Sequence, residues 1–315
     1  MARLVSMLAG ALAAAVLATG SAAAAEAESC RTVRFSDVGW TDITATTALA
    51  SVVLEALGYE PDVKVLSVPV TYASLKNDDI DVFLGNWMPT MEADLAPYRD
   101  DGSVEVLGAN LEGAKYTLAV PRYTYAAGLK SFQDIARFKD DLDGRIYGIE
   151  PGNDGNRLIL DMIEKDQFGL GDFELVESSE QGMLAQVKRA VARKQPIVFL
   201  GWAPHPMNAS IEMDYLAGGD DVFGPDFGGA TVFTNVRKGY RDACPNAARL
   251  IAQLKFTLPM ENEIMGAILD DGKEPKAAAT AWLRAHPDVL SGWLEGVETT
   301  GGKPGLEAVK AALGS

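Results

Sequence analysis

The stretch Phe199-Leu200-Gly201-Trp202-Ala203-Pro204-His205-Pro206 decides how this chain is organised. It completes the apolar run of residues 197–200, which is typical of a buried strand. Gly201 ends the run, Trp202 follows at once, and the two prolines oppose further regular pairing. The stretch therefore predicts a strand that places a large aromatic side chain at its mouth.

The same construction occurs twice earlier in the chain. Val82-Phe83-Leu84-Gly85-Asn86-Trp87-Met88-Pro89 again joins an apolar run to a glycine, a tryptophan and a proline. A third version, Phe35-Ser36-Asp37-Val38-Gly39-Trp40-Thr41-Asp42, follows the first predicted strand. Ligands of open α/β sheets bind beyond the carboxyl ends of the strands. We therefore expect Trp40, Trp87 and Trp202 to meet at one site.

Short apolar runs alternate with amphipathic segments, which predicts an α/β fold with a parallel, doubly wound sheet. The echo between the Trp87 and Trp202 segments indicates two lobes of similar plan. We predict a first lobe of residues 26–112 and 208–315, a second lobe of residues 113–207, and a hinge of two crossing segments between them. The crossings are expected near residues 108–115 and 207–214. Predicted strands cover residues 32–37, 62–68, 82–85, 116–120, 145–149, 173–176, 197–201 and 230–236, and the main helices cover residues 43–57, 70–77, 131–138, 156–167, 179–193, 245–256, 261–270 and 275–285.

Residues 1–25 have the features of a secretory signal peptide. Arg3 is their only charged residue, an apolar, alanine-rich run reaches Gly20, and Ala23-Ala24-Ala25 offers a cleavage site. A membrane anchor is the alternative, but the apolar run is short and ends in small residues. We therefore expect a secreted mature chain.

The bulk composition narrows the classes of partner. The formal net charge is −16 and no cluster of Lys and Arg stands out, which argues against nucleic acid. An acidic surface keeps a protein soluble and mildly favours cationic ligands. Cys30 and Cys244 are the only cysteines, so an oxidising compartment favours a disulfide between them, with two unpaired thiols as the alternative. We predict no metal site, because neither of the two histidines lies near a cysteine in the sequence.

No motif in the sequence indicates catalysis. There is no Gly-x-Ser-x-Gly elbow, no phosphate-binding Gly-x-x-x-x-Gly-Lys-Ser/Thr loop and no His-Glu-x-x-His pair. His205 lies between two prolines, which is typical of a loop residue. We expect neither a cofactor nor an enzymatic step.

The aromatic residues indicate a binding site for a quaternary ammonium group. Such a group carries a full charge but no N–H donor, and its methyl groups are apolar, so aromatic faces suit it better than carboxylates. Each face contributes about 0.5–2 kcal/mol when water is excluded, and micromolar affinity needs about 8 kcal/mol. Trp40, Trp87 and Trp202 supply three faces, and Tyr116, at the start of the second lobe, is a candidate fourth.

Two polar residues point to the rest of the ligand. Asp42 follows Trp40 closely and would accept a hydrogen bond from a ligand hydroxyl while repelling a ligand carboxylate, which favours choline over glycine betaine. Asn153, in the turn Gly152-Asn153-Asp154-Gly155, is a second candidate contact. The structural alternatives are a helix N-cap at Asp42 and turn geometry at Asn153.

These motifs together resemble the choline-binding proteins of bacterial ABC importers, within the glycine betaine/choline substrate-binding group. The resemblance covers the whole mature chain. It implies a two-lobed periplasmic-binding-protein fold of type II, a Cys30–Cys244 disulfide, an aromatic box of Trp40, Trp87, Tyr116 and Trp202, and contacts from Asp42 and Asn153 to the choline hydroxyl. It rests on Val38-Gly39-Trp40-Thr41-Asp42, Phe83-Leu84-Gly85-Asn86-Trp87-Met88-Pro89, Lys115-Tyr116, Tyr147-Gly148-Ile149-Glu150-Pro151-Gly152 and the Phe199 to Pro206 stretch.

The expected function is therefore capture of choline in the periplasm and delivery to an ABC transporter permease. Acetylcholine is a further candidate ligand, and we expect a monomer. A glycine betaine or carnitine binder of the same fold is the first alternative. A secreted choline-ester hydrolase is a more remote one, because it would need a nucleophile and a base beside the box.

Overall fold

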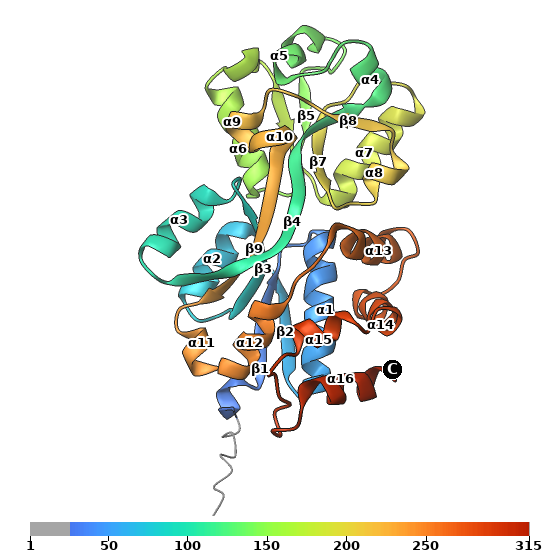
Figure 1. Cartoon of the computed structure of the whole chain (residues 1–315). Coiled ribbons are helices and arrows are strands. Elements are labelled where there is room, and N and C mark those ends of the chain that lie inside the picture. The colour runs from blue at the N-terminus through green and yellow to red at the C-terminus, as the bar shows by residue number, and fades with distance from the viewer. Residues whose placement is uncertain (1–25, 315) are drawn as a thin grey trace, which may run out of the picture.

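The structure is a computed structural model that describes residues 26–314. The predicted signal peptide lies outside the described residues. Within them the chain forms a two-lobed α/β protein, with β4 (Val104–Pro121) and β9 (Gly229–Arg237) running between the lobes (Figure 1). The first lobe carries the amino-terminal strands and the carboxyl-terminal helices, and the second lobe is built from the middle of the chain. None of the described helices is long and apolar enough to cross a bilayer.

One sheet runs through both lobes in the order β2-β1-β3-β9-β4-β7-β5-β6, with β8 paired to β4. The outer strands of each lobe pair in parallel, as predicted. The central pairs of β9 with β3 and β4, and of β4 with β7, are antiparallel, because a chain that crosses to the second lobe returns in the opposite direction. The other strands are β1 (Thr32–Asp37), β2 (Glu60–Val65), β3 (Val82–Met88), β5 (Arg145–Tyr147), β6 (Glu174–Val176), β7 (Phe199–Ala203) and β8 (Met213–Tyr215).

Helices cover the sheet in both lobes (Figure 1). In the first lobe the longest is α1 (Thr41–Leu57), which ends at Gly58 in a left-handed conformation with a φ of 95°, as glycine permits. The other helices of the first lobe are α2 (Val68–Lys76), α3 (Glu92–Asp100), α11 (Tyr240–Ala243), α12 (Pro245–Gln253), α13 (Leu258–Leu269), α14 (Pro275–Ala285), α15 (Val289–Trp293) and α16 (Gly305–Leu313), and those of the second are α4 (Arg122–Ala126), α5 (Phe132–Ile135), α6 (Asp154–Glu164), α7 (Glu180–Ala192), α8 (Met207–Ser210), α9 (Asp220–Phe223) and α10 (Pro225–Gly228).

The chain does not cross back to the first lobe near residues 207–214, where the second crossing was expected. Residues 213–215 form β8, which pairs with the far end of β4 through Ala119↔Tyr215. The chain then stays in the second lobe through α9 and α10 and comes back along β9, whose register with β4 runs from Lys115↔Gly229 to Val104↔Arg237. The hinge is therefore a pair of adjacent antiparallel strands.

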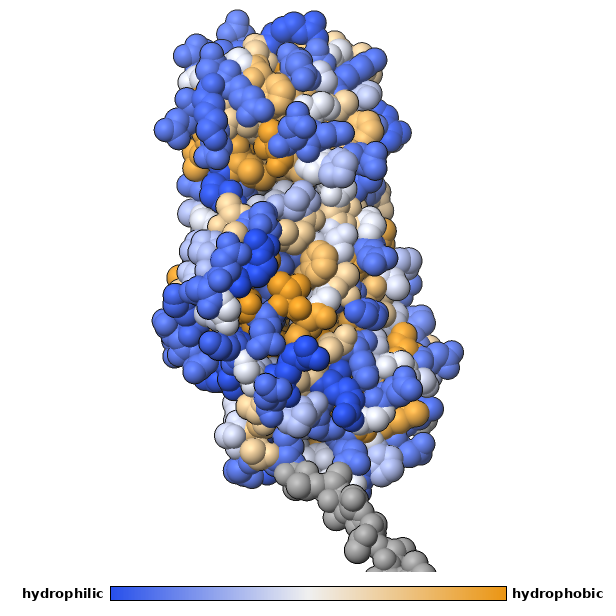
Figure 2. Space-filling view, turned by 60° about the vertical axis from the view of Figure 1, so that its left-hand side comes forward, coloured by the Kyte–Doolittle hydropathy of each residue, from blue (hydrophilic) through white to orange (hydrophobic). Residues whose placement is uncertain are grey.

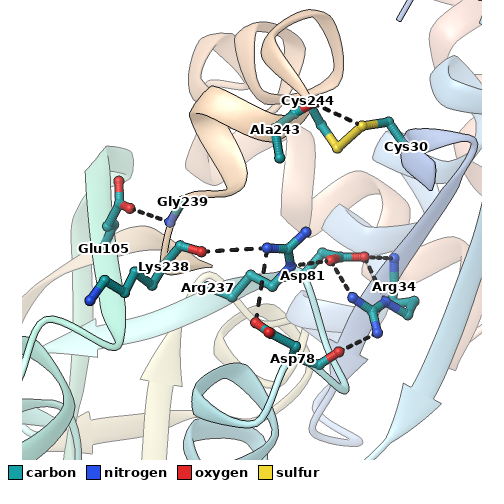
Figure 3. A network of polar contacts seen from close by, with 10 residues as sticks. All are labelled: Cys30, Arg34, Asp78, Asp81, Glu105, Arg237, Lys238, Gly239, Ala243 and Cys244. Atoms are coloured by element: carbon teal, nitrogen blue, oxygen red, sulfur yellow. Dashed lines mark hydrogen bonds and ion pairs between the residues drawn. A yellow bond between two sulfur atoms is a disulfide. The ribbon is translucent and has the colours of Figure 1, made fainter. Parts of the chain in front are cut away.

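A disulfide and a group of ion pairs link the strands at the end of the first lobe that lies away from the second (Figure 3). Cys30 and Cys244 form a disulfide across a sequence separation of 214 residues, which confirms that prediction. Nearby, the buried carboxylate of Asp81 accepts hydrogen bonds from Arg34 Nη2 at 2.7 Å and from Arg237 Nε at 2.7 Å. These contacts join β1, β9 and the start of β3 at the end of β3 opposite to Trp87.

The surface is much more hydrophilic than the interior. Figure 2 shows one face of the molecule, which is mostly hydrophilic and carries apolar groups in patches. Among the described residues, exposed large apolar side chains include Val70 of α2 and Leu160 of α6. The apolar core instead fills the space between the sheet and its helices in both lobes.

Candidate functional site

Five of the six predicted site residues line one cavity between the lobes. The space between them amounts to about 250 Å³ with its opening included. The side chains that form it are almost fully buried, with Trp87 only 3% exposed and Tyr116 only 5% exposed. The lobes are thus in a closed arrangement. The lining residues are Trp40, Asp42, Trp87, Tyr116, Ile149 and Trp202.

Strand ends and a helix start deliver these side chains. Trp40 is the N-cap of α1, directly after the β1–α1 turn. Trp87 and Trp202 were expected beyond their strands, but each is the last residue but one within its strand, β3 and β7 respectively. Pairing continues through both, with Trp87 opposite Val232 and Trp202 opposite Tyr116, and it stops where Pro89 and Pro204 follow.

The aromatic rings stand at steep angles to one another. The ring centroids of Trp87 and Tyr116 are 6.0 Å apart with an interplanar angle of 61°. Those of Tyr116 and Trp202 are 6.4 Å apart with an interplanar angle of 84°. Rings in such an arrangement form the walls of a box, and several π faces can then be presented to one cation.

Asp42 adds a carboxylate to this box. Its Oδ2 accepts a hydrogen bond from Trp87 Nε1 at 3.2 Å, whereas its buried Oδ1 has no hydrogen-bond partner. The N-cap of α1 is Trp40, so the N-cap alternative for Asp42 is wrong. Burial, and to a lesser extent the nearby Glu180, raise the pKa of Asp42 to about 8. An unpartnered acceptor in a closed cavity can take a hydroxyl donor.

Asn153 lies behind the box, since it is not one of the lining residues. It is the N-cap of α6, where its Oδ1 accepts from the backbone N–H of Asn156 at 2.8 Å. The same oxygen accepts from the Tyr116 hydroxyl at 3.3 Å, and Nδ2 donates to the carbonyl of Glu150. Asn153 thus combines the expected turn geometry with support for Tyr116. Its direct contact with a ligand stays a prediction.

The comparison with known proteins agrees with this geometry. Residues 31–285 match the family model of the substrate-binding domain of the ABC-type glycine betaine transport system. The chain belongs to this family. Its members are transport proteins that bind substrates outside the cytoplasm and are not enzymes.

Solved structures of the family show the same architecture. An ABC-transporter choline-binding protein in complex with choline is 68% identical, with 91% of this chain and 100% of that chain covered, at a TM-score of 0.91. A structure described as this type of protein in an unliganded, semi-closed conformation has the same identity and coverage but a TM-score of 0.85. Lactococcal OpuAC, closed on glycine betaine, is 26% identical over 84% of this chain and 99% of that chain, at a TM-score of 0.74. The family fold of type II is therefore confirmed.

The closed structure also places three residues beside the box that the sequence did not indicate as part of the site. Glu150 accepts a hydrogen bond from Trp40 Nε1, and burial raises its pKa to about 7. Glu180 and His205 lie behind Trp40 and Trp202 and are almost fully buried. Glu150 belongs to a motif that carried the resemblance, and His205 to the stretch that decides the fold. No local pattern marks Glu180.

Proposed function

We propose that this protein is the periplasmic choline-binding component of an ABC importer, which closes around choline and delivers it to its permease. The observation that carries the proposal is an aromatic box that also holds an unpartnered carboxylate oxygen, Oδ1 of Asp42. The aromatic faces suit a trimethylammonium group, and Asp42 suits the hydroxyl at the other end of the ligand. Asp42 would repel the carboxylate of glycine betaine or carnitine.

The comparisons support choline over betaine. The relative described with choline is 68% identical to this chain, whereas the relative described with glycine betaine is 26% identical. The closed lobes also agree better with the choline complex, at a TM-score of 0.91, than with the unliganded form, at 0.85.

Both lobes contribute to the proposed choline site. Trp40, Asp42 and Trp87 come from the first lobe, Tyr116 comes from β4, which crosses into the second lobe, and Trp202 comes from β7 of the second lobe. A ligand that touches both lobes binds the closed state better and therefore shifts the population toward it. We place the lobe boundaries within β4 and β9, and we expect the closed monomer to be the form that the permease recognises.

Calorimetric titration of the mature protein tests the proposal. Choline should bind, and the neutral isostere 3,3-dimethyl-1-butanol should fail, because it has the shape and the hydroxyl of choline but no charge for the aromatic faces to attract. Tight binding of glycine betaine without binding of choline would establish the betaine alternative. Acetylcholine should not be hydrolysed, since the lining residues offer no serine, cysteine or histidine nucleophile.

A further inference from the structure

Glu180 joins the two lobes directly behind the box. It is the first residue of α7 in the second lobe, and it is only 1% exposed. Its Oε2 accepts from the backbone N–H of Thr41 at 2.9 Å, and its Oε1 accepts from the Thr41 hydroxyl at 2.6 Å. Thr41 is the first residue of α1 in the first lobe. This contact therefore exists only when the lobes are closed.

The contact satisfies a helix end that its own lobe leaves open. The first N–H groups of a helix have no partner within the helix, and the N-cap of α1, Trp40, makes no side-chain capping bond. Glu180 supplies an acceptor for one of these groups, and its negative charge suits the positive end of the helix dipole. Thr41 lies between Trp40 and Asp42, so a cap at this position fixes two residues of the box.

His205 links the same carboxylate to Trp202 on the other side of the box. The backbone N–H of Met207 donates to His205 Nδ1 at 2.9 Å, so Nε2 carries the hydrogen and donates to Glu180 Oε1 at 3.1 Å. The His205 ring lies 4.8 Å from the ring of Trp202, at an angle of 74°. The carboxylate of Glu180 is thus bonded to the residue between Trp40 and Asp42 and to the neighbour of Trp202.

We propose that Glu180 is a positioning residue of the ligand site, which caps α1 from across the cleft and holds the box closed around its ligand. This inference rests on the proposed function, because it assigns Glu180 a part in keeping choline bound. Glu180 does not line the cavity, so its effect passes through Thr41 and His205. Its loss should therefore speed the release of the ligand more than it slows capture.

A double-mutant cycle of Glu180→Gln and Thr41→Val tests the contact. Glu180→Gln removes the charge, and Thr41→Val removes the hydroxyl while the N–H of residue 41 remains. We expect Glu180→Gln to weaken choline binding about 10- to 100-fold, mainly through faster dissociation in stopped-flow tryptophan fluorescence, and Thr41→Val to weaken it about 3- to 10-fold. The double variant should lose less than the product of the two factors, because one contact is removed in both.

The melting temperature of the ligand-free protein separates closure from general stability. It should stay near the wild-type value in all three variants, because the open form does not make the contact. The matched control is Glu174→Gln, which removes the same charge from an exposed position on β6 and should bind choline like the wild type. Glu180→Gln with wild-type dissociation, multiplicative losses in the cycle, or a loss of ligand-free stability that accounts for the loss of binding would each overturn the inference.

The wild-type titration keeps the two proposals apart. If the wild type binds glycine betaine in place of choline, the proposed function fails, and the same cycle measured with glycine betaine still decides the role of Glu180. If the wild type binds choline but the cycle shows no coupling, only the role of Glu180 is wrong.

Discussion

Replacing Asp42 by asparagine tests how the site tells choline from other quaternary ammonium compounds. In the closed structure, Asp42 Oδ2 accepts from Trp87 Nε1 at 3.2 Å and Oδ1 has no partner. Asparagine keeps the shape, and its amide oxygen can still accept from Trp87. Its NH₂ group then replaces the free oxygen, and it cannot accept the hydroxyl hydrogen of choline.

The expected loss follows from the strength of a charged hydrogen bond. Such bonds contribute about 1.5–3 kcal/mol, and each 1.4 kcal/mol corresponds to about a tenfold change in affinity. Asp42→Asn should therefore weaken choline binding by about 10- to 150-fold. Glycine betaine should bind unchanged or better, because the variant removes a negative charge that opposes its carboxylate.

Calorimetry with three ligands separates these effects. Choline has the hydroxyl, tetramethylammonium lacks it, and glycine betaine has a carboxylate in its place. Choline should lose the most affinity and tetramethylammonium less, since only the attraction between charges is removed for the latter. Equal losses for all three ligands, or wild-type affinity for choline, would refute the reasoning that Asp42 receives the hydroxyl.

Three further outcomes follow from the structure. Trp202→Ala should weaken choline binding by about 30-fold or more in calorimetry, since a desolvated cation–π contact is worth about 2 kcal/mol, while Trp202→Phe should lose less. Replacing both Cys30 and Cys244 by serine should lower the free energy of unfolding in urea by about 2–5 kcal/mol without changing choline affinity. Burial raises the pKa of Asp42 to about 8 and that of Glu150 to about 7 on closure, so the closed ligand-free form takes up protons. Its population should therefore rise as the pH falls from about 8.5 to about 5, as small-angle scattering can measure.

Patterns within short stretches of the sequence predicted the strands, the helix ends and the tryptophans of the site. Strand β1 occupies the predicted residues 32–37, and α1 ends at Gly58 as expected, although it begins at Thr41, two residues before the prediction. Each tryptophan of the box could be found because it directly follows a glycine or lies two residues after one at the end of an apolar run. The disulfide followed from an even cysteine count.

The hinge could not be predicted in the same way. The first part of β4 contains Gly108 and Gly113 and alternates poorly, and its register with β9 shifts repeatedly between Val106 and Ala114. Such an irregular strand carries a weak periodic signal. Pro206 ends the alternation of strands and helices, which favours a crossing between the lobes at residues 207–214. In the structure, β8 instead pairs with β4 within the second lobe.

Glu180 could not be recognised because its role arises from a residue 139 positions away. On its own helix it is an ordinary first-turn glutamate after the N-cap Ser179. Only the closed arrangement brings it to Thr41. In the same way, the sequence identifies Asn153 only as a polar residue of a turn. Its hydrogen bond to the Tyr116 hydroxyl depends on the packing of α6 against β4.

The carboxylates around the cavity explain why a cation should be needed to close it. Asp42 and Glu150 reach Trp87 and Trp40 of the box, and Glu180 reaches the residue next to Trp40. Burial and the charge of Glu180 both raise the pKa of Asp42, so an empty closed site brings negative charges together at a cost. A quaternary ammonium between the aromatic faces offsets that repulsion and cannot itself lose a proton. The contacts of Glu180 then hold a closed state that the charge of the ligand has made favourable, and a neutral ligand of the same shape would leave the repulsion in place.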